Sequence, residues 1–140
     1  MDTHNPLRQP LDTVRAIYAA FGRGDLLGLL AQLHPQIDWG VSVAAPGAEQ
    51  VPMLRHGVGH EAVQRYFAGV ARLEFLRFEV GRFLADQEVV VTEIEFEARH
   101  RGNGRSISSA ELHHWTVDRG LAIRFRPYVD TAALIELYRP

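Results

Sequence analysis

The stretch that decides the fold runs from Glu88 to Val129 and reads EVVVTEIEFEARHRGNGRSISSAELHHWTVDRGLAIRFRPYV. It contains three runs rich in β-branched and aromatic residues, separated by Asn103-Gly104 and by Asp118-Arg119-Gly120. Both breaks are typical of tight hairpin turns, because asparagine, aspartate and glycine tolerate the positive φ angles that such turns need. The sequence therefore predicts an antiparallel meander with strands over 88–101, 105–117 and 121–129, followed by a short helix.

The middle predicted strand carries a carboxylate, an imidazole and an indole on one face, because Glu111, His113 and Trp115 are spaced by two. A two-residue first turn would pair His113 with Ile94 and Glu111 with Phe96, and the second turn would pair His113 with Phe125. A shift of one residue would instead turn Glu111 toward solvent. The predicted inner face is mostly apolar and comprises Thr92, Ile94, Phe96, Ala98, Ser109, Glu111, His113, Trp115, Ile123, Phe125, Pro127 and Val129.

Upstream of the meander the pattern is helical. Apolar residues at three- and four-residue spacing predict a helix from Leu11, a second one capped by Asp25 and a third over 61–72. A short strand over 37–39 and a longer one over 75–84 complete the pattern. Helices followed by an antiparallel sheet indicate an α+β fold, with a flexible tail over residues 1–10 and a single domain over 11–140.

Composition excludes several kinds of chemistry. The 140 residues contain no cysteine, and all 15 basic residues are arginine, so thiolate, Schiff-base and lysine-base mechanisms are impossible. The net charge of −2 argues against nucleic acid as a partner. The sequence has no apolar run long enough to span a membrane and no signal-peptide pattern at its start, so we expect a cytoplasmic location.

Other candidate residues are weaker. Trp39 and Trp115 suit either the walls of a binding pocket or a plain core. His56 and His60 are spaced for a loop that would not fix a metal ion, so we expect no metal site. Arg124 and Arg126 alternate with inner-face residues and are expected to pair with Glu93, Glu95 or Glu97 on the outer face. The basic stretch 99–105 is expected to be a solvated hairpin tip.

The order of these elements resembles the NTF2-like superfamily, and specifically the SnoaL-like polyketide cyclases and the ketosteroid isomerases. The resemblance covers nearly the whole chain from Leu11. It rests on the segments 14–34, 37–39 and 113–120, on Gly59–Val63 with Tyr66-Phe67, and on Arg124–Thr131. It implies a conical α+β barrel in which a curved, antiparallel (mixed) sheet is wrapped by three N-terminal helices around an apolar pocket. It also implies a homodimer formed through the outer face of the sheet.

The catalytic positions of these relatives do not all transfer. For a ketosteroid isomerase, the resemblance places Trp39 at the carboxylate base, Ile17 at the tyrosine and His113 at the protonated aspartate. For a SnoaL-type cyclase, the pocket histidine matches His113, but the catalytic aspartate falls at Pro127, which has no proton to exchange.

The sequence supports two main functional hypotheses. The first is cofactor-free proton transfer by His113 and Glu111 on a carbonyl or polyketide-like substrate, because the two side chains can reach one ligand. The second is non-catalytic binding of a small, apolar or polycyclic ligand; a protein-interaction module is a third, weaker alternative. The residues expected to contact the ligand are Trp39, Phe67, Ile94, Phe96, Trp115, Phe125 and Val129.

Overall fold

The computed structural model describes residues 8–140 of the chain. Its α-helices are α1 (Pro10–Gly22), α2 (Leu26–Leu30), α3 (Gly59–Val70) and α4 (Thr131–Tyr138), with two 3-10 turns, η1 (Ala48–Gln50) and η2 (Pro52–Leu54), between β1 and β2. Asp25 caps α2 as predicted, because its side chain accepts a hydrogen bond from the backbone N–H of Gly28. Pro10 lies in α1, so the helix reaches into the expected tail; residues 1–7 of that tail lie outside the described residues.

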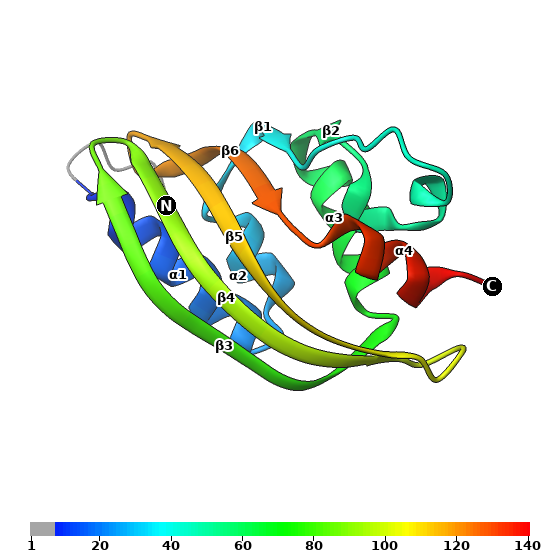
Figure 1. Ribbon diagram of the computed structural model, residues 1–140. Coiled ribbons are helices and arrows are strands. Elements are labelled where there is room, and N and C mark those ends of the chain that lie inside the picture. Colours follow the sequence, from blue (N-terminus) through cyan, green and yellow to red (C-terminus); the bar gives the residue numbers. More distant parts are fainter. Residues whose placement is uncertain (1–7) are drawn as a thin grey trace.

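The six strands form one curved sheet in the order β2-β1-β6-β5-β4-β3. They are β1 (Leu33–Trp39), β2 (Gly57–Val58), β3 (Leu73–Asp86), β4 (Val89–His100), β5 (Ser106–Asp118) and β6 (Leu121–Tyr128). Strand β1 runs parallel to β6, and the other pairs are antiparallel, so the sheet is mixed. Figure 1 shows α1 and α2 inside the curve of the three long strands. The expected α+β class with a curved, helix-covered sheet is confirmed, but the sheet stays open rather than closing into a barrel.

The predicted pairing of the first hairpin is wrong by two residues. Glu111 lies opposite Ile94 and His113 opposite Thr92, because the turn is a four-residue loop closed by His100 and Arg105. The faces of both strands are nevertheless as predicted, since a shift of two residues returns every side chain to the same side. Thr92, Ile94, Phe96, Ala98, His113 and Trp115 are all buried.

The second hairpin has a tighter turn than predicted and a bulge elsewhere. Arg119 and Gly120 both have positive φ angles, and they connect Asp118 directly to Leu121. The register then shifts between Thr116 and Val117, which leaves Ile123 without a partner. The bulge buries Ala122 and leaves Ile123 half-buried, so Ile123 was assigned wrongly; Phe125 is buried as predicted, but it lies opposite Trp115 rather than His113.

Strand β3 is a long edge strand with two irregularities. Its register with β4 shifts between Phe75 and Arg77 and again between Val80 and Phe83. Arg82 of β3 forms an ion pair with Glu93 of β4, since its Nε lies 2.7 Å from Glu93 Oε1. Strand β3 is therefore irregular along its length, and this ion pair joins it to β4.

The core divides into two clusters of buried residues. One gathers α1, α2, β1 and part of β5 and β6 around Trp39, Trp115 and Phe125. The other gathers α4, the loop before α3 and the middle of β4 around Leu54, Ile94 and Leu134. Tyr18 and Tyr66 pack against both clusters, so they lie at the boundary.

No helix within residues 8–140 is long and apolar enough to cross a membrane. The cytoplasmic location stays a prediction.

Candidate functional site

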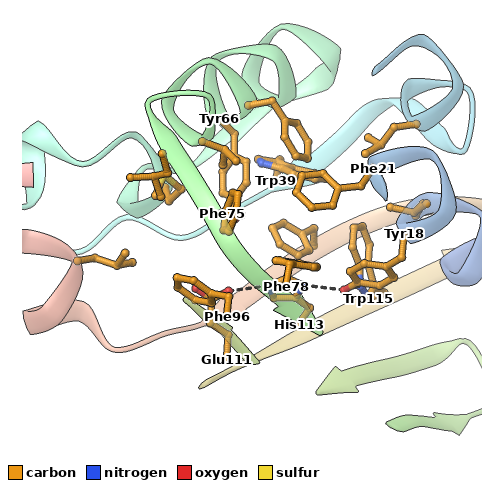
Figure 2. A pocket seen from close by; sticks show the side chains of 18 residues that line it. Tyr18, Phe21, Trp39, Tyr66, Phe75, Phe78, Phe96, Glu111, His113 and Trp115 are labelled. Atoms are coloured by element: carbon orange, nitrogen blue, oxygen red, sulfur yellow. Dashed lines mark hydrogen bonds and ion pairs between the residues drawn. The ribbon is translucent and has the colours of Figure 1, made fainter. Parts of the chain in front are cut away.

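A cavity lies between the two core clusters. The space open to water-sized molecules in it is about 70 Å³, which is enough for several waters. Its wall is almost entirely apolar and is rich in aromatic rings (Figure 2). The lining residues are Ile17, Tyr18, Phe21, Leu29, Trp39, Met53, Tyr66, Phe67, Val70, Leu73, Phe75, Phe78, Phe96, Glu111, His113, Trp115, Phe125 and Leu134.

A chain of three hydrogen bonds runs along one side of the cavity. The Nε1–H of Trp115 donates to Tyr18 Oη at 3.0 Å, and Tyr18 Oη lies 2.6 Å from His113 Nδ1. His113 Nε2 in turn lies 2.8 Å from Glu111 Oε2. If Tyr18 donates to Nδ1 and His113 donates from Nε2, each contact has one donor and one acceptor, so a neutral His113 and an ionised Glu111 satisfy the whole chain.

Two elements bring these groups together. Glu111, His113 and Trp115 alternate along β5 and share its inner face. Tyr18 lies on the inward stripe of α1, which packs against β5 and β6. The rings of Tyr18 and His113 are stacked, with centroids 5.9 Å apart and planes at 9°. The helix therefore supplies the residue that orients the imidazole.

Burial controls the protonation of the tyrosines. Loss of water raises the pKa of Tyr18 above its ordinary value, and the charge of Glu111 acts in the same direction. The pKa of Tyr66 is raised for the same two reasons. Both phenols are therefore protonated at neutral pH. Each ring keeps some exposed area, which we assign to the cavity wall.

The structure brings most of the predicted site residues to this cavity. Glu111 and His113 lie on its wall and contact one another, with side chains only 12% and 9% exposed. Five of the predicted ligand contacts also line it, namely Trp39, Phe67, Phe96, Trp115 and Phe125. Ile94 does not: it is buried in the second core cluster. Val129 lines a separate surface hollow that Glu111 also borders.

Tyr18 and Tyr66 line the cavity but are not among the predicted site residues. Both tyrosines fall in the apolar stripes of their helices, and this spacing predicts core positions. The only signal was a hydroxyl within each stripe. Tyr18 is 95 residues from His113 along the chain, so its contact with the imidazole could not be read from local spacing.

The predicted partners of the two outer arginines are wrong. Arg126 donates two hydrogen bonds to Asp38, at 3.0 and 2.8 Å, and Arg124 Nε lies 3.5 Å from the same carboxylate. Strand β1 pairs with β6, and it therefore brings Asp38 beside these arginines. The hydrogen bonds from Arg126 hold the pKa of Asp38 below its usual value, although partial burial acts in the opposite direction.

The two histidines expected in a loop have different partners, and His60 lies in the first turn of α3 rather than in a loop. His56 Nε2 contacts the Asp38 carboxylate, whereas His60 Nε2 lies 3.1 Å from the backbone oxygen of Leu33. Within residues 8–140 there is no group of three or more His, Asp or Glu side chains that could hold a metal ion.

The hairpin tip, expected to be merely solvated, makes specific contacts. Asn103 Nδ2 donates to the backbone oxygen of Leu137 at 2.9 Å, and Arg105 Nη1 donates to that of Glu136 at 2.7 Å. The tip thereby satisfies carbonyl groups at the end of α4.

Comparisons with known proteins define the family. Residues 14–125 match the model of the SnoaL-like domain. An NTF2-like protein of unknown function from Burkholderia pseudomallei is 27% identical, with a TM-score of 0.80 over 96% of this chain and 100% of that chain. TerC, crystallised with polyporic acid, is 25% identical, with a TM-score of 0.77 over 92% of this chain and 97% of that chain.

More distant structures share the fold. A candidate SnoaL-like polyketide cyclase from Mesorhizobium loti is 15% identical, with a TM-score of 0.69 over 86% of this chain and 99% of that chain. No protein of curated function matches the sequence. The match to the domain model covers most of the chain and agrees with the architecture. The chain therefore belongs to the SnoaL-like family, within the NTF2-like fold.

Proposed function

We propose that this protein is a cofactor-free enzyme that moves a proton on a small carbonyl compound held in the aromatic cavity. The observation that carries the proposal is the chain Tyr18–His113–Glu111, which ends in a carboxylate on an apolar wall. Both nitrogens of His113 are engaged, whereas no residue among 8–140 donates to Glu111 Oε1. Glu111 is therefore the better base, and His113 and Tyr18 hold and polarise it.

The reaction balances without a further reactant. Glu111 Oε1 takes a proton from the carbon next to the carbonyl, and the electrons of the broken C–H bond form an enolate. Where a C=C bond is conjugated with the enolate, the same proton returns from Glu111 to the far carbon of this dienolate, which gives an isomer with the double bond moved. Hydrogen bonds from His113 to Glu111 and from Tyr18 to His113 keep the carboxylate oriented throughout.

Exchange of α-protons tests this activity before the substrate is known. One- and two-ring ketones, beginning with 2-cyclohexenone and 2-indanone, are incubated with the protein in D₂O, and loss of the α-proton signals is followed by NMR. We expect Glu111→Gln to slow protein-dependent exchange by about 100-fold. His113→Gln should cause a smaller loss, because its role is to orient the base.

The control variant is Glu97→Gln, which changes an exposed carboxylate of β4. It should leave the exchange rate unchanged. Equal rates in wild type and Glu111→Gln would contradict the proposal.

A second candidate function is ligand binding without turnover. It is favoured by Pro127, which stands where the related cyclases are expected to carry an acid, and by the absence of a second carboxylate among the described lining residues. The structure of TerC with polyporic acid supports a trial of that compound as a ligand for this chain. Binding of polyporic acid together with no exchange of any ketone would favour this second function.

We also propose that the protein forms a homodimer through the outer face of the sheet. Leu112 and Tyr128 lie on that face and are 45% and 61% exposed. Sedimentation velocity should show a dimer that Leu112→Arg converts to a monomer. Leu27→Arg, at an 80% exposed position of α2, is the matched control and should leave the dimer intact. A monomeric wild type would contradict the proposal.

A further inference from the structure

A surface hollow adjoins the cavity on a side that the proton-transfer chain does not use. It has a volume of about 360 Å³ and lies where α1 ends and α2 begins. Neither Glu111 nor His113 lines it, and Figure 2 shows Phe21, which does line it, well apart from Glu111. The hollow and the cavity share six apolar residues, namely Phe21, Leu29, Phe67, Val70, Leu73 and Phe75.

The wall shared by the two spaces is apolar and only partly buried. Phe21, Phe67, Val70 and Phe75 each keep some exposed area. Ligand sites in proteins are concave and mostly apolar, with a few polar groups that fix the orientation of the ligand. A ligand that reaches the cavity from this side stays in contact with apolar surface, so the hollow suits the role of the mouth of the cavity.

Two charged side chains line the hollow among the described residues, Asp25 and Arg101. The carboxylate of Asp25 is already engaged at both oxygens. Its Oδ1 accepts a hydrogen bond from the backbone N–H of Gly28 at 2.9 Å, and its Oδ2 lies 3.5 Å from Nη2 of Arg23. Arg101 is therefore the charged group of this hollow that is left for a ligand.

Arg101 is fixed beside the end of α3. Its backbone N–H donates to the carbonyl oxygen of Arg72 at 2.9 Å, and its Nε donates to that of Ala71 at 3.3 Å. The contact with Ala71 is its only side-chain hydrogen bond within residues 8–140, so both terminal nitrogens stay available. Arg99 and Arg105 each lie within 4 Å of a carboxylate, whereas Arg101 has no carboxylate partner in this part of the chain.

We propose that the hollow is the mouth of the cavity and that Arg101 binds a carboxylate of the substrate there. The substrate is then a cyclic ketone with an acidic arm. Its ring lies in the aromatic cavity with the carbonyl group toward Glu111, and its arm follows the shared wall to Arg101. A guanidinium suits this role, because two of its parallel N–H groups can donate to the two oxygens of one carboxylate.

This inference rests on the proposed function and deepens it, because it names the substrate class and a residue that determines specificity. The probe is 3-(4-oxocyclohexyl)propanoic acid, whose ketone and carboxylate lie at opposite ends of the molecule. Its primary amide has nearly the same shape without the charge. Isothermal titration calorimetry measures the affinity of the protein for both compounds.

We expect the wild type to bind the acid about fivefold more tightly than the amide, which is the effect of one partly exposed ion pair. This preference should decrease in about 0.5 M NaCl, because salt screens charges that solvent can reach. Equal affinities of the wild type for the acid and the amide would overturn the inference, and so would a failure of both compounds to bind.

Arg101→Gln should bind the acid and the amide equally. Its affinity for the amide should match that of the wild type, which shows that the variant keeps an intact cavity. Arg119→Gln, in the exposed turn between β5 and β6, is the matched control and should keep the preference for the acid. An undiminished preference in Arg101→Gln would overturn the inference.

Exchange of the α-protons of the same acid in D₂O distinguishes this inference from the proposed function. A preference for the acid that depends on Arg101, without any exchange, would retain the mouth and reject the catalysis. Exchange that depends on Glu111, but proceeds equally for the acid and the amide at concentrations below saturation, would reject the role of Arg101 and retain the catalysis.

Discussion

Tyr18 holds the buried polar chain together, because its hydroxyl accepts from Trp115 and contacts Nδ1 of His113. Removal of this one oxygen leaves an indole N–H and an imidazole nitrogen without partners in an apolar wall. Such groups are costly when they are buried. Each of these side chains is a hydrogen-bond partner of another one in the chain. We therefore expect a substitution at any of them to change the stability of the protein.

Tyr18→Phe should therefore destabilise the protein by about 2 kcal/mol, since two buried polar groups lose their partner. Urea unfolding measures this loss as a lower midpoint with an unchanged slope. Ser106→Ala removes a hydroxyl from an exposed position of β5, and it should stay within about 0.5 kcal/mol of the wild type. Equal stabilities of the Tyr18→Phe and Ser106→Ala variants would show that the chain contributes little to folding.

Asp38 makes the stability depend on pH. Its hydrogen bonds from Arg126 lower the pKa of the carboxyl in the folded state, so its contribution is complete above the unfolded pKa of about 3.9 and declines as the pH falls below it. Wild type should therefore be more stable than Asp38→Asn at pH 7, and the difference should shrink between pH 4 and lower values, as measured by thermal unfolding.

The control for this prediction is Asp86→Asn, which alters an exposed carboxylate at the end of β3. It should show a smaller difference from wild type at every pH. A difference between wild type and Asp38→Asn that grows in acid would contradict the linkage.

At the scale of elements, the β4–β5 hairpin joins distant parts of the fold. Its tip lies over the end of α4, where Asn103 and Arg105 donate to backbone carbonyl groups of the last turn. Arg105 also places a positive charge near the helix C-terminus, which complements the helix dipole.

Asn103→Ala should destabilise the protein by about 1 kcal/mol, because carbonyl groups at the end of α4 lose their donor. Hydrogen exchange measured by mass spectrometry should show faster exchange over α4. Ser106→Ala, an exposed change in the same hairpin, should leave that exchange unchanged. If hydrogen exchange over α4 is equally fast in Asn103→Ala and in Ser106→Ala, the hairpin tip does not stabilise the helix.

The same hairpin shows what the sequence could and could not predict. The Asn103-Gly104 pair located the turn, and the alternation of Glu111, His113 and Trp115 identified the inner face. The loop length was wrong, because the contacts of the tip with α4 come from residues more than 30 positions away. The predicted inner face is still correct, because the pairing of β4 with β5 differs from the prediction by two residues and side chains alternate with a period of two. The contacts of Tyr18 and Asp38 could not be predicted, because they depend on how α1 packs on the sheet and on the pairing of β1 with β6. No local sequence pattern contains this information.

At the scale of the whole molecule, Phe125 lies both in the first core cluster and on the wall of the cavity. Its ring is 2% exposed and packs against Trp39, Tyr66, His113 and Trp115. The aromatic wall is thus a single packed unit that supports the hydrogen-bonded chain of Tyr18, His113 and Glu111.

Phe125→Ala should cost about 3–5 kcal/mol, because it removes a fully buried ring and leaves a cavity. Urea unfolding measures this loss, which is a large share of the stability of an ordinary domain of about 5–15 kcal/mol. Leu27→Ala, on α2, should cost less than about 1 kcal/mol, since its side chain is 80% exposed. If the two alanine variants lose similar free energies of unfolding, the packing of Phe125 contributes no more to stability than an exposed side chain does.

The irregular edge strand β3 has a consequence for how copies of this protein behave at high concentration. A 14-residue strand with a free edge is a template on which another chain can add a strand and begin an aggregate. The two shifts in register interrupt the regular row of N–H and C=O groups, and the ion pair of Arg82 with Glu93 places charge beside the second shift. The other edge, β2, has only two residues. We therefore expect both edges of the open sheet to resist intermolecular strand pairing, because β3 is irregular and β2 is very short.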